Sequence, residues 1–212
     1  MSKIKAVFFD FGNVIYLADQ MIAYKEFAKF CQLSPEEVYE KIYLGKIEKI
    51  PDEGGSFEEF YEKSTLAIGA NKTKLTPEKF RKVWCDIFLP YEGIEKILEL
   101  MRPEIKKILV SNTNLIHWEG AMSRLPLIKK HFPDKNHQVL SFLVGKRKPN
   151  QLMWKEALEK AGCLPGEALF IDDLALFVFT YQHIFGGPGM VFNGRYDSIN
   201  LLKNEFVYQG II

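Results

Sequence analysis

The chain has 212 residues, of which 47% are hydrophobic and 26% are charged, a balance that excludes a disordered or collagen-like protein. Its 28 basic and 27 acidic side chains give a net charge of +1, which offers no support for nucleic-acid binding or for electrostatic attachment to a membrane. No apolar stretch approaches the ~20 residues that span a bilayer.

The three cysteines, Cys31, Cys85 and Cys163, lie far apart in the sequence. An odd number of distant cysteines is a poor disulfide framework and contains no paired metal-ligand motif. We therefore expect a cytoplasmic protein in a reducing compartment.

The first predicted strand covers residues 4–9, a short and continuously apolar run typical of a strand buried on both faces. The following segment, residues 17–90, contains no strand candidate. Three helix starts, each a hydroxyl side chain followed by proline or glutamate, occur within it: Ser34, Ser56 and Thr76. With a loop expected at residues 51–55, this segment predicts a helical insertion.

Strand and helix patterns alternate through the rest of the chain. Strands are predicted at residues 108–110 and 168–171, with weaker candidates at 139–144 and 190–192. Helices are predicted at residues 93–101, 150–161 and 174–185. The last of these is apolar all round, so we expect it to be buried on most sides. The alternation predicts an α/β fold around an open parallel sheet.

Polar residues follow the three strongest strands. Asp10, Ser111 and the pair Asp172–Asp173 would lie at the carboxyl edge of the sheet, where open α/β folds bind ligands. Single residues of these types are often turn or capping residues. Adjacent aspartates repel each other unless a cation lies between them, and carboxylates suit Mg²⁺. Lys148 belongs either to a solvated basic loop or to a phosphate site.

Together these residues resemble the haloacid dehalogenase superfamily. The matching segments are FFDFGNV at residues 8–14, VSNTN at 110–114, Lys148–Pro149, and FIDD at 170–173. The four motifs occur in order over nearly the whole chain. The sequence is most similar to the subgroup with Asp-x-Gly-Asn-Val and Ser-Asn-Thr-Asn signatures, which includes bacterial sugar-1-phosphate phosphatases.

The resemblance implies a Rossmann-like three-layer sandwich formed by residues 1–16 and 91–212, with a helical cap domain of the C1 type formed by residues 17–90. It implies that Asp10 is the nucleophile of a phosphatase. The metal site would be Mg²⁺ held by Asp10, the Gly12 carbonyl and Asp172, with Gly12 also bordering the substrate.

The remaining site residues follow from the same resemblance. Asp173 would order the metal shell or pair with Lys148. Ser111 and the Asn112 backbone amide would bind phosphoryl oxygens, and Lys148 would neutralise charge that develops on the transferred group. The expected partner is a small phosphorylated metabolite, most simply a sugar phosphate, rather than a nucleic acid or a membrane. The oligomeric state stays open.

Two departures from the family pattern bear on activity. Family phosphatases usually carry a second aspartate two residues after the nucleophile, where this chain has Gly12. Without that acid and base, turnover should be slow and good leaving groups, such as anomeric phosphates, should be favoured. The second departure places Leu176 and Phe177 where close relatives carry polar residues, and this change either is neutral or weakens the metal site.

Three interpretations therefore stay open: a phosphatase, a 2-haloacid dehalogenase, and an inactive module that binds a phosphorylated ligand or a protein. Dehalogenases of the superfamily also lack the second aspartate, but they need no Mg²⁺. His117, close to the predicted edge of the sheet, is either a substrate contact or a packing residue.

Overall fold

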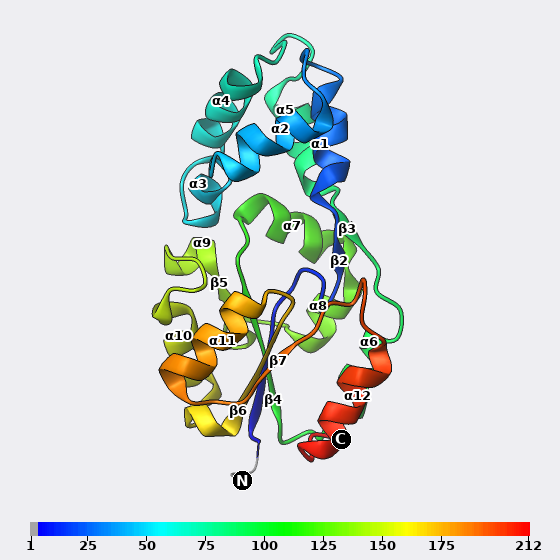
Figure 1. Ribbon diagram of the computed structural model, residues 1–212, viewed down its shortest axis with the longest axis vertical. Coiled ribbons are helices and arrows are strands. Elements are labelled where there is room, and N and C mark those ends of the chain that lie inside the picture. Colours follow the sequence, from blue (N-terminus) through cyan, green and yellow to red (C-terminus); the bar gives the residue numbers. More distant parts are fainter. Residues whose placement is uncertain (1–3) are drawn as a thin grey trace.

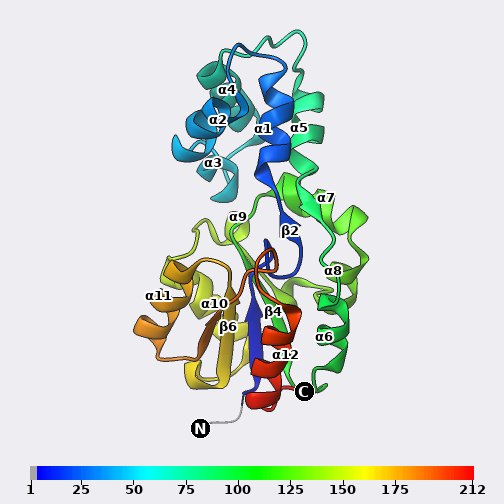
Figure 2. The same ribbon diagram turned by 45° about the vertical axis from the view of Figure 1, so that its right-hand side comes forward.

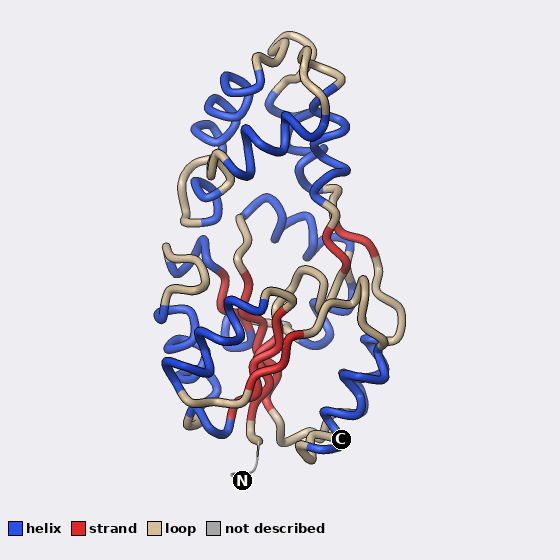
Figure 3. Tube along the Cα trace, viewed as in Figure 1, coloured by secondary structure: helices blue, strands red, loops and turns tan. Residues whose placement is uncertain are grey.

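The computed structural model describes residues 4–212 and contains a five-stranded, all-parallel sheet in the order β5-β4-β1-β6-β7 (Figures 1 and 3). The strands are β1 (Ala6–Phe9), β4 (Lys106–Ser111), β5 (Gln138–Leu140), β6 (Ala168–Asp172) and β7 (Gly189–Val191). Phe9 of β1 lies in register with Leu109 of β4 and Ile171 of β6. This register brings the residues that follow these strands to one edge.

Helices cover both faces of the sheet (Figure 2). Alternate strand residues point to opposite faces, so Phe9 and Leu109 pack on one side, whereas Phe8 and Val110 pack on the other. The first face is covered by α6 (Ile94–Leu100), α7 (Leu115–Arg124), α8 (Pro126–His131) and α12 (Ile199–Tyr208). The second is covered by α10 (Gln151–Ala161) and α11 (Ala175–Phe185), with short α9 (Ser141–Val144) after β5. The predicted three-layer α/β sandwich is confirmed.

A separate group of helices follows β1 and lies beyond the carboxyl edge of the sheet (Figure 1). This helical module comprises α1 (Gln20–Ala28), α2 (Pro35–Tyr39), the π-helical turn Glu40–Leu44, α3 (Lys49–Asp52), α4 (Phe57–Ile68) and α5 (Pro77–Cys85). It has its own apolar core, in which Phe80 stacks on Phe27 with ring centroids 4.4 Å apart. The predicted caps are present, since Ser34, Ser56 and Thr76 each accept a backbone hydrogen bond.

Three local predictions were wrong. The segment predicted to contain no strand begins with β2 (Leu17–Ala18) and ends with β3 (Phe88–Leu89), which pair antiparallel. Two-residue strands carry no periodic signal that a sequence pattern could reveal. Within the expected loop, Pro51 and Asp52 belong to α3, and residues 141–144 form α9 instead of extending the strand.

Helix α11 also differs from the expectation that it is buried on most sides. Only Val178 and Tyr181 of this helix are buried, whereas Leu176 and Phe179 are 64% and 62% exposed. The helix packs on the sheet through one face, so its apolar composition does not reflect burial. Within residues 4–212, no helix is long and apolar enough to cross a membrane.

Candidate active site

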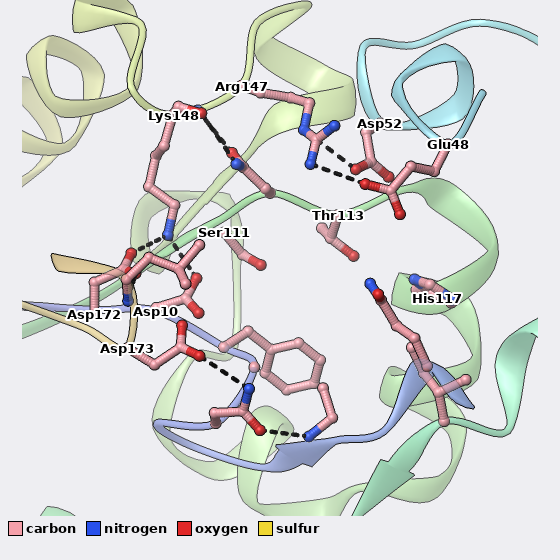
Figure 4. A pocket seen from close by; sticks show the side chains of 18 of the residues that line it. Asp10, Glu48, Asp52, Ser111, Thr113, His117, Arg147, Lys148, Asp172 and Asp173 are labelled. Carbon is pink, nitrogen blue, oxygen red and sulfur yellow. Dashed lines mark hydrogen bonds and ion pairs between the residues drawn. The ribbon is translucent and has the colours of Figure 1, made fainter. Parts of the chain in front are cut away.

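The carboxyl edge of the sheet forms the floor of a cavity of about 340 Å³ (Figure 4). Asp10 follows β1, Ser111 ends β4 and Asp172 ends β6, and all three line the cavity together with Asp173. The parallel register of the three strands accounts for this convergence. The predicted strand-end residues therefore meet in one place.

Lys148 is the buried cation of this floor. Its Nζ donates to Asp10 Oδ1 at 2.5 Å, to Asp172 Oδ2 at 2.6 Å and to the Val110 carbonyl at 2.8 Å. Its side chain is only 1% exposed. Burial lowers the pKa of Lys148, but the charges of Asp10 and Asp172 outweigh this effect and hold the pKa above its ordinary value. Lys148 is therefore a positive charge fixed between two carboxylates.

Asn112 positions the backbone that carries this lysine. The Lys148 amide donates to Asn112 Oδ1 at 2.7 Å, and Asn112 Nδ2 donates to the Lys148 carbonyl at 3.2 Å. The Asn112 side chain thus hydrogen-bonds to both the backbone N–H and the backbone carbonyl of Lys148. The sequence indicated only a role for the Asn112 backbone, so this positioning role was missed.

Asp173 bonds to two asparagines rather than to Lys148. Asn13 Nδ2 donates to Asp173 Oδ2 at 2.9 Å, and Asn193 Nδ2 donates to the same oxygen at 3.4 Å. Burial, followed by the charge of Asp10, raises the pKa of Asp173 to about 6. Asp173 therefore does not form the predicted ion pair with Lys148 in this structure.

The three aspartates offer a suitable donor set for a hard divalent cation. Asp10, Asp172 and Asp173 each present a carboxylate oxygen within 4.8 Å of the others. Carboxylate oxygens are the ligands that Mg²⁺ prefers, and a dication would relieve the repulsion that raises the Asp173 pKa. Gly12 lines the same cavity.

His117 has a structural role in this conformation. Its Nε2 lies 2.8 Å from the Trp84 carbonyl and must donate to it, so Nδ1 accepts from Asn114 Nδ2 at 3.2 Å. Burial lowers the pKa of His117 to about 4, although the bond to Trp84 raises it. Because both ring nitrogens are engaged, the neutral imidazole joins α7 to α5 and has no nitrogen left for a substrate.

A second charged group lines the cavity and was not anticipated. Glu48 and Asp52 come from the helical module, and both contact Arg147, the residue before Lys148. Burial, followed by the charge of Asp52, raises the pKa of Glu48 to about 8, although Arg147 lowers it. In the sequence these residues lie in ordinary charged stretches, and no motif distinguishes them from solvated side chains.

A family model described as haloacid dehalogenase-like hydrolase matches residues 4–175. The protein is a haloacid dehalogenase-like hydrolase. The match includes every strand-end residue on the cavity floor, which confirms the resemblance found in the four sequence motifs.

This hydrolase is 28% identical over 179 residues to D-ribitol-5-phosphate phosphatase of Bacteroides thetaiotaomicron, covering 80% of this chain and 83% of that relative. Its fold is similar to that of a predicted hydrolase of the family from Porphyromonas gingivalis, with a TM-score of 0.78 and 23% identity over 97% of this chain and 98% of that one.

A family enzyme from Bacteroides thetaiotaomicron, solved with magnesium and inorganic phosphate, also has a similar fold. Its TM-score is 0.73, with 24% identity over 93% of this chain and 98% of that chain.

The buried state of His117 predicts a pH-dependent contribution to stability. Because the folded pKa is depressed to about 4, this hydrolase should lose the contribution as the pH falls from 6.5 towards 4. The free energy of unfolding of the wild type, relative to His117→Gln, should fall by about 1.4 kcal/mol per pH unit in that window. Urea unfolding of both proteins at several pH values measures this difference.

The control is His183→Gln, because His183 is exposed on α11. Its free energy of unfolding should follow that of the wild type across the same pH range. An equal pH dependence in wild type and His117→Gln would contradict the neutral, buried imidazole.

Proposed function

We propose that this hydrolase is a Mg²⁺-dependent phosphatase that acts on a small phosphorylated sugar or polyol through an aspartyl-phosphate on Asp10. The observation that carries the proposal is the Asp10 carboxylate, fixed by Lys148 on the cavity floor beside two further aspartates. The similarity to a ribitol-phosphate phosphatase over most of both chains supports the same reaction class.

Asp10, Asp172 and Asp173 would hold the Mg²⁺, together with the Gly12 carbonyl. When bound, the metal would withdraw negative charge from the phosphoryl oxygens and orient the phosphate. Lys148 would add a fixed positive charge on the side of Asp10 and Asp172. Ser111 and the Asn112 amide would bind the remaining phosphoryl oxygens.

The reaction needs two displacements at phosphorus. A carboxylate oxygen of Asp10 attacks phosphorus, the bond to the leaving oxygen breaks, and that oxygen takes a proton from solvent. Water then attacks the aspartyl-phosphate, which releases inorganic phosphate and restores the Asp10 carboxylate. Lys148 remains protonated throughout and stabilises the charge on the transferred group.

We further propose that residues 17–90 act as a cap domain. The cavity walls combine this segment with the residues of the sheet, since Gln20, Tyr43 and Trp84 line the same cavity as Asp10. Closure of such a cap would exclude water until the phosphate is in place. A cytoplasmic location suits the proposal, because the three cysteines are free.

The alternative activities have weaker support. Dehalogenases of the superfamily need no Mg²⁺, whereas three carboxylates converge here in a set that suits a divalent cation, which disfavours a dehalogenase. A module that only binds ligands has no need for a nucleophile held at 2.5 Å from a buried lysine. Both alternatives predict that no phosphate is released.

The proposed function predicts phosphate release that requires Asp10 and Mg²⁺. We expect the purified protein to hydrolyse a panel of sugar and polyol phosphates, with sugar 1-phosphates faster than their 6-phosphate isomers because the anomeric oxygen leaves more readily. Asp10→Asn should lower kcat by at least about 10³-fold, since the amide is a poor nucleophile. A phosphate-release assay measures both.

Release that is unaffected by Asp10→Asn would indicate a contaminating enzyme and contradict the proposal. Equal rates with 1-phosphates and 6-phosphates would keep the phosphatase but contradict the leaving-group preference. No release from any ester would favour the binding module or the dehalogenase.

Gly12 allows a direct test of the missing proton donor. A side chain there has room, because an added Cβ would lie 3.4 Å from Ala18 Cβ and 3.9 Å from Asp10 Oδ2. We expect Gly12→Asp to raise kcat for alkyl phosphates by about tenfold or more, since general acid help is typically worth 10²–10⁴-fold. Steady-state kinetics on an alkyl and an aryl phosphate measure the effect.

Gly12→Asn is the matched control, because it has the same shape and no acidic proton. If Gly12→Asp gives no gain with alkyl phosphates, or if Gly12→Asn gives the same gain, the missing acid does not limit turnover.

A further inference from the structure

A second polar group lies across the cavity from the aspartates and Lys148 (Figure 4). It consists of Glu48, Asp52 and Arg147, which we call the distal cluster. Arg147 Nη2 donates to Glu48 Oε1 at 3.2 Å, and Arg147 Nε lies 3.4 Å from Asp52 Oδ2. Glu48 and Asp52 are each 6% exposed. The cluster therefore forms a buried, charged wall at the end of the cavity opposite the proposed phosphate site.

The burial of these charges is better explained by a function than by a contribution to the stability of the fold. Removing two carboxylates and a guanidinium from water costs several kcal/mol per ion, and pairing them often does no more than compensate. A well-packed apolar wall would stabilise the fold at least as well. Their position on the lining of a ligand-sized cavity indicates that they serve a bound molecule instead.

Part of the hydrogen-bonding capacity of this wall is unused. Asp52 Oδ1 accepts from Asn114 Nδ2 at 2.9 Å, and Glu48 Oε1 accepts from Arg147. Thr113 is 3% exposed, and its Oγ1 is buried without a hydrogen-bond partner. Figure 4 shows Thr113 between the two charged groups, and the residue lines the cavity. Buried polar atoms usually have partners, so the unpartnered Thr113 hydroxyl points to a polar ligand.

The charges determine which ligand fits. Two carboxylates share one guanidinium, so the wall has no positive charge to spare for an anion. Carboxylate oxygens and a threonine hydroxyl pair well with hydroxyl groups, which both donate and accept hydrogen bonds. A second phosphate or a carboxylate at this end would lose its hydration beside the Asp52 carboxylate and would find no unpaired cation to replace it.

We infer that the distal cluster, with Thr113, binds the hydroxyl groups at the far end of an uncharged polyol or sugar leaving group, and that it rejects leaving groups with a second anionic group. This inference rests on the proposed phosphatase function. It makes Glu48 and Asp52 specificity residues of the leaving group, while Asp10 and Lys148 act on the phosphate.

The first test compares esters with and without distal hydroxyls. Glu48→Ala should raise KM for ribitol 5-phosphate by about tenfold or more, because the hydroxyl contacts are lost and Arg147 loses a partner. For phenyl phosphate, which has no hydroxyls, kcat/KM should change by less than about threefold. Glu48→Gln keeps the hydrogen-bonding groups and should restore most of the affinity. The exposed Glu40→Ala, in the same helical module, is the control.

The second test compares glucitol 6-phosphate with 6-phosphogluconate, which differ by a CH₂OH group in place of a carboxylate. The wild type should prefer the neutral compound by at least about tenfold in kcat/KM, since the carboxylate loses its hydration there without gaining an unpaired cation. Asp52→Asn should bring the two kcat/KM values closer together, because it leaves the Arg147 guanidinium free to pair with an anion.

Equal kcat/KM values for the neutral and the acidic compound in the wild type would overturn the inference. So would an equal loss with ribitol 5-phosphate and phenyl phosphate in Glu48→Ala, since that pattern indicates a general structural role. If the wild type hydrolyses no ester in an Asp10-dependent way, the proposed function fails as well, which separates that result from failure of the distal cluster alone.

Discussion

The active-site region depends on one interaction, the buried ammonium of Lys148 between the carboxylates of Asp10 and Asp172. Two carboxylates this close would repel each other without a cation, and an unpaired lysine could not remain charged at 1% exposure. The interaction therefore requires that β1 and β6 end in register and that the loop carrying Lys148 reach the same edge. Asn112 meets the second requirement by bonding both backbone polar groups of Lys148.

Consecutive residues of that loop serve opposite ends of the cavity. Lys148 points to the aspartates on the floor, and Arg147 points to Glu48 and Asp52 of the helical module (Figure 4). The same loop thus sets the charge at the proposed phosphate end and at the proposed leaving-group end. His117 supplies another link between the parts of the chain, because its ring bonds to the backbone of Trp84 in α5. The position of the helical module therefore affects the shape of the cavity, because buried polar contacts join the module to the rest of the chain.

The sequence predicted the sheet and its edge well, because buried parallel strands leave a clear apolar signature and their carboxyl ends meet at one edge. Asp10, Ser111, Asp172 and Asp173 were found in this way, whereas Lys148 was found in a basic segment through the family resemblance, and all five line one cavity. The distal cluster was missed because Glu48 and Arg147 are 99 positions apart and each resembles a solvated charge. The burial of helix α11 was predicted wrongly for a related reason. Hydrophobicity alone does not tell which face of a helix packs on the sheet, and Phe179 lies on the exposed face. Pairings between the helical module and the sheet depend on tertiary packing, which no local pattern encodes.

The measurement that tests the central role of Asp10 most directly is the melting temperature with Mg²⁺ and beryllium fluoride, which together imitate a phosphorylated aspartate. At about a hundredfold excess over Kd, the wild type should melt roughly 5–10 °C higher than with either component alone, because only a ligand that prefers the folded state stabilises it. Asp10→Asn should show no such shift. No shift in the wild type, or an equal shift in Asp10→Asn, would contradict an aspartyl-phosphate site at Asp10.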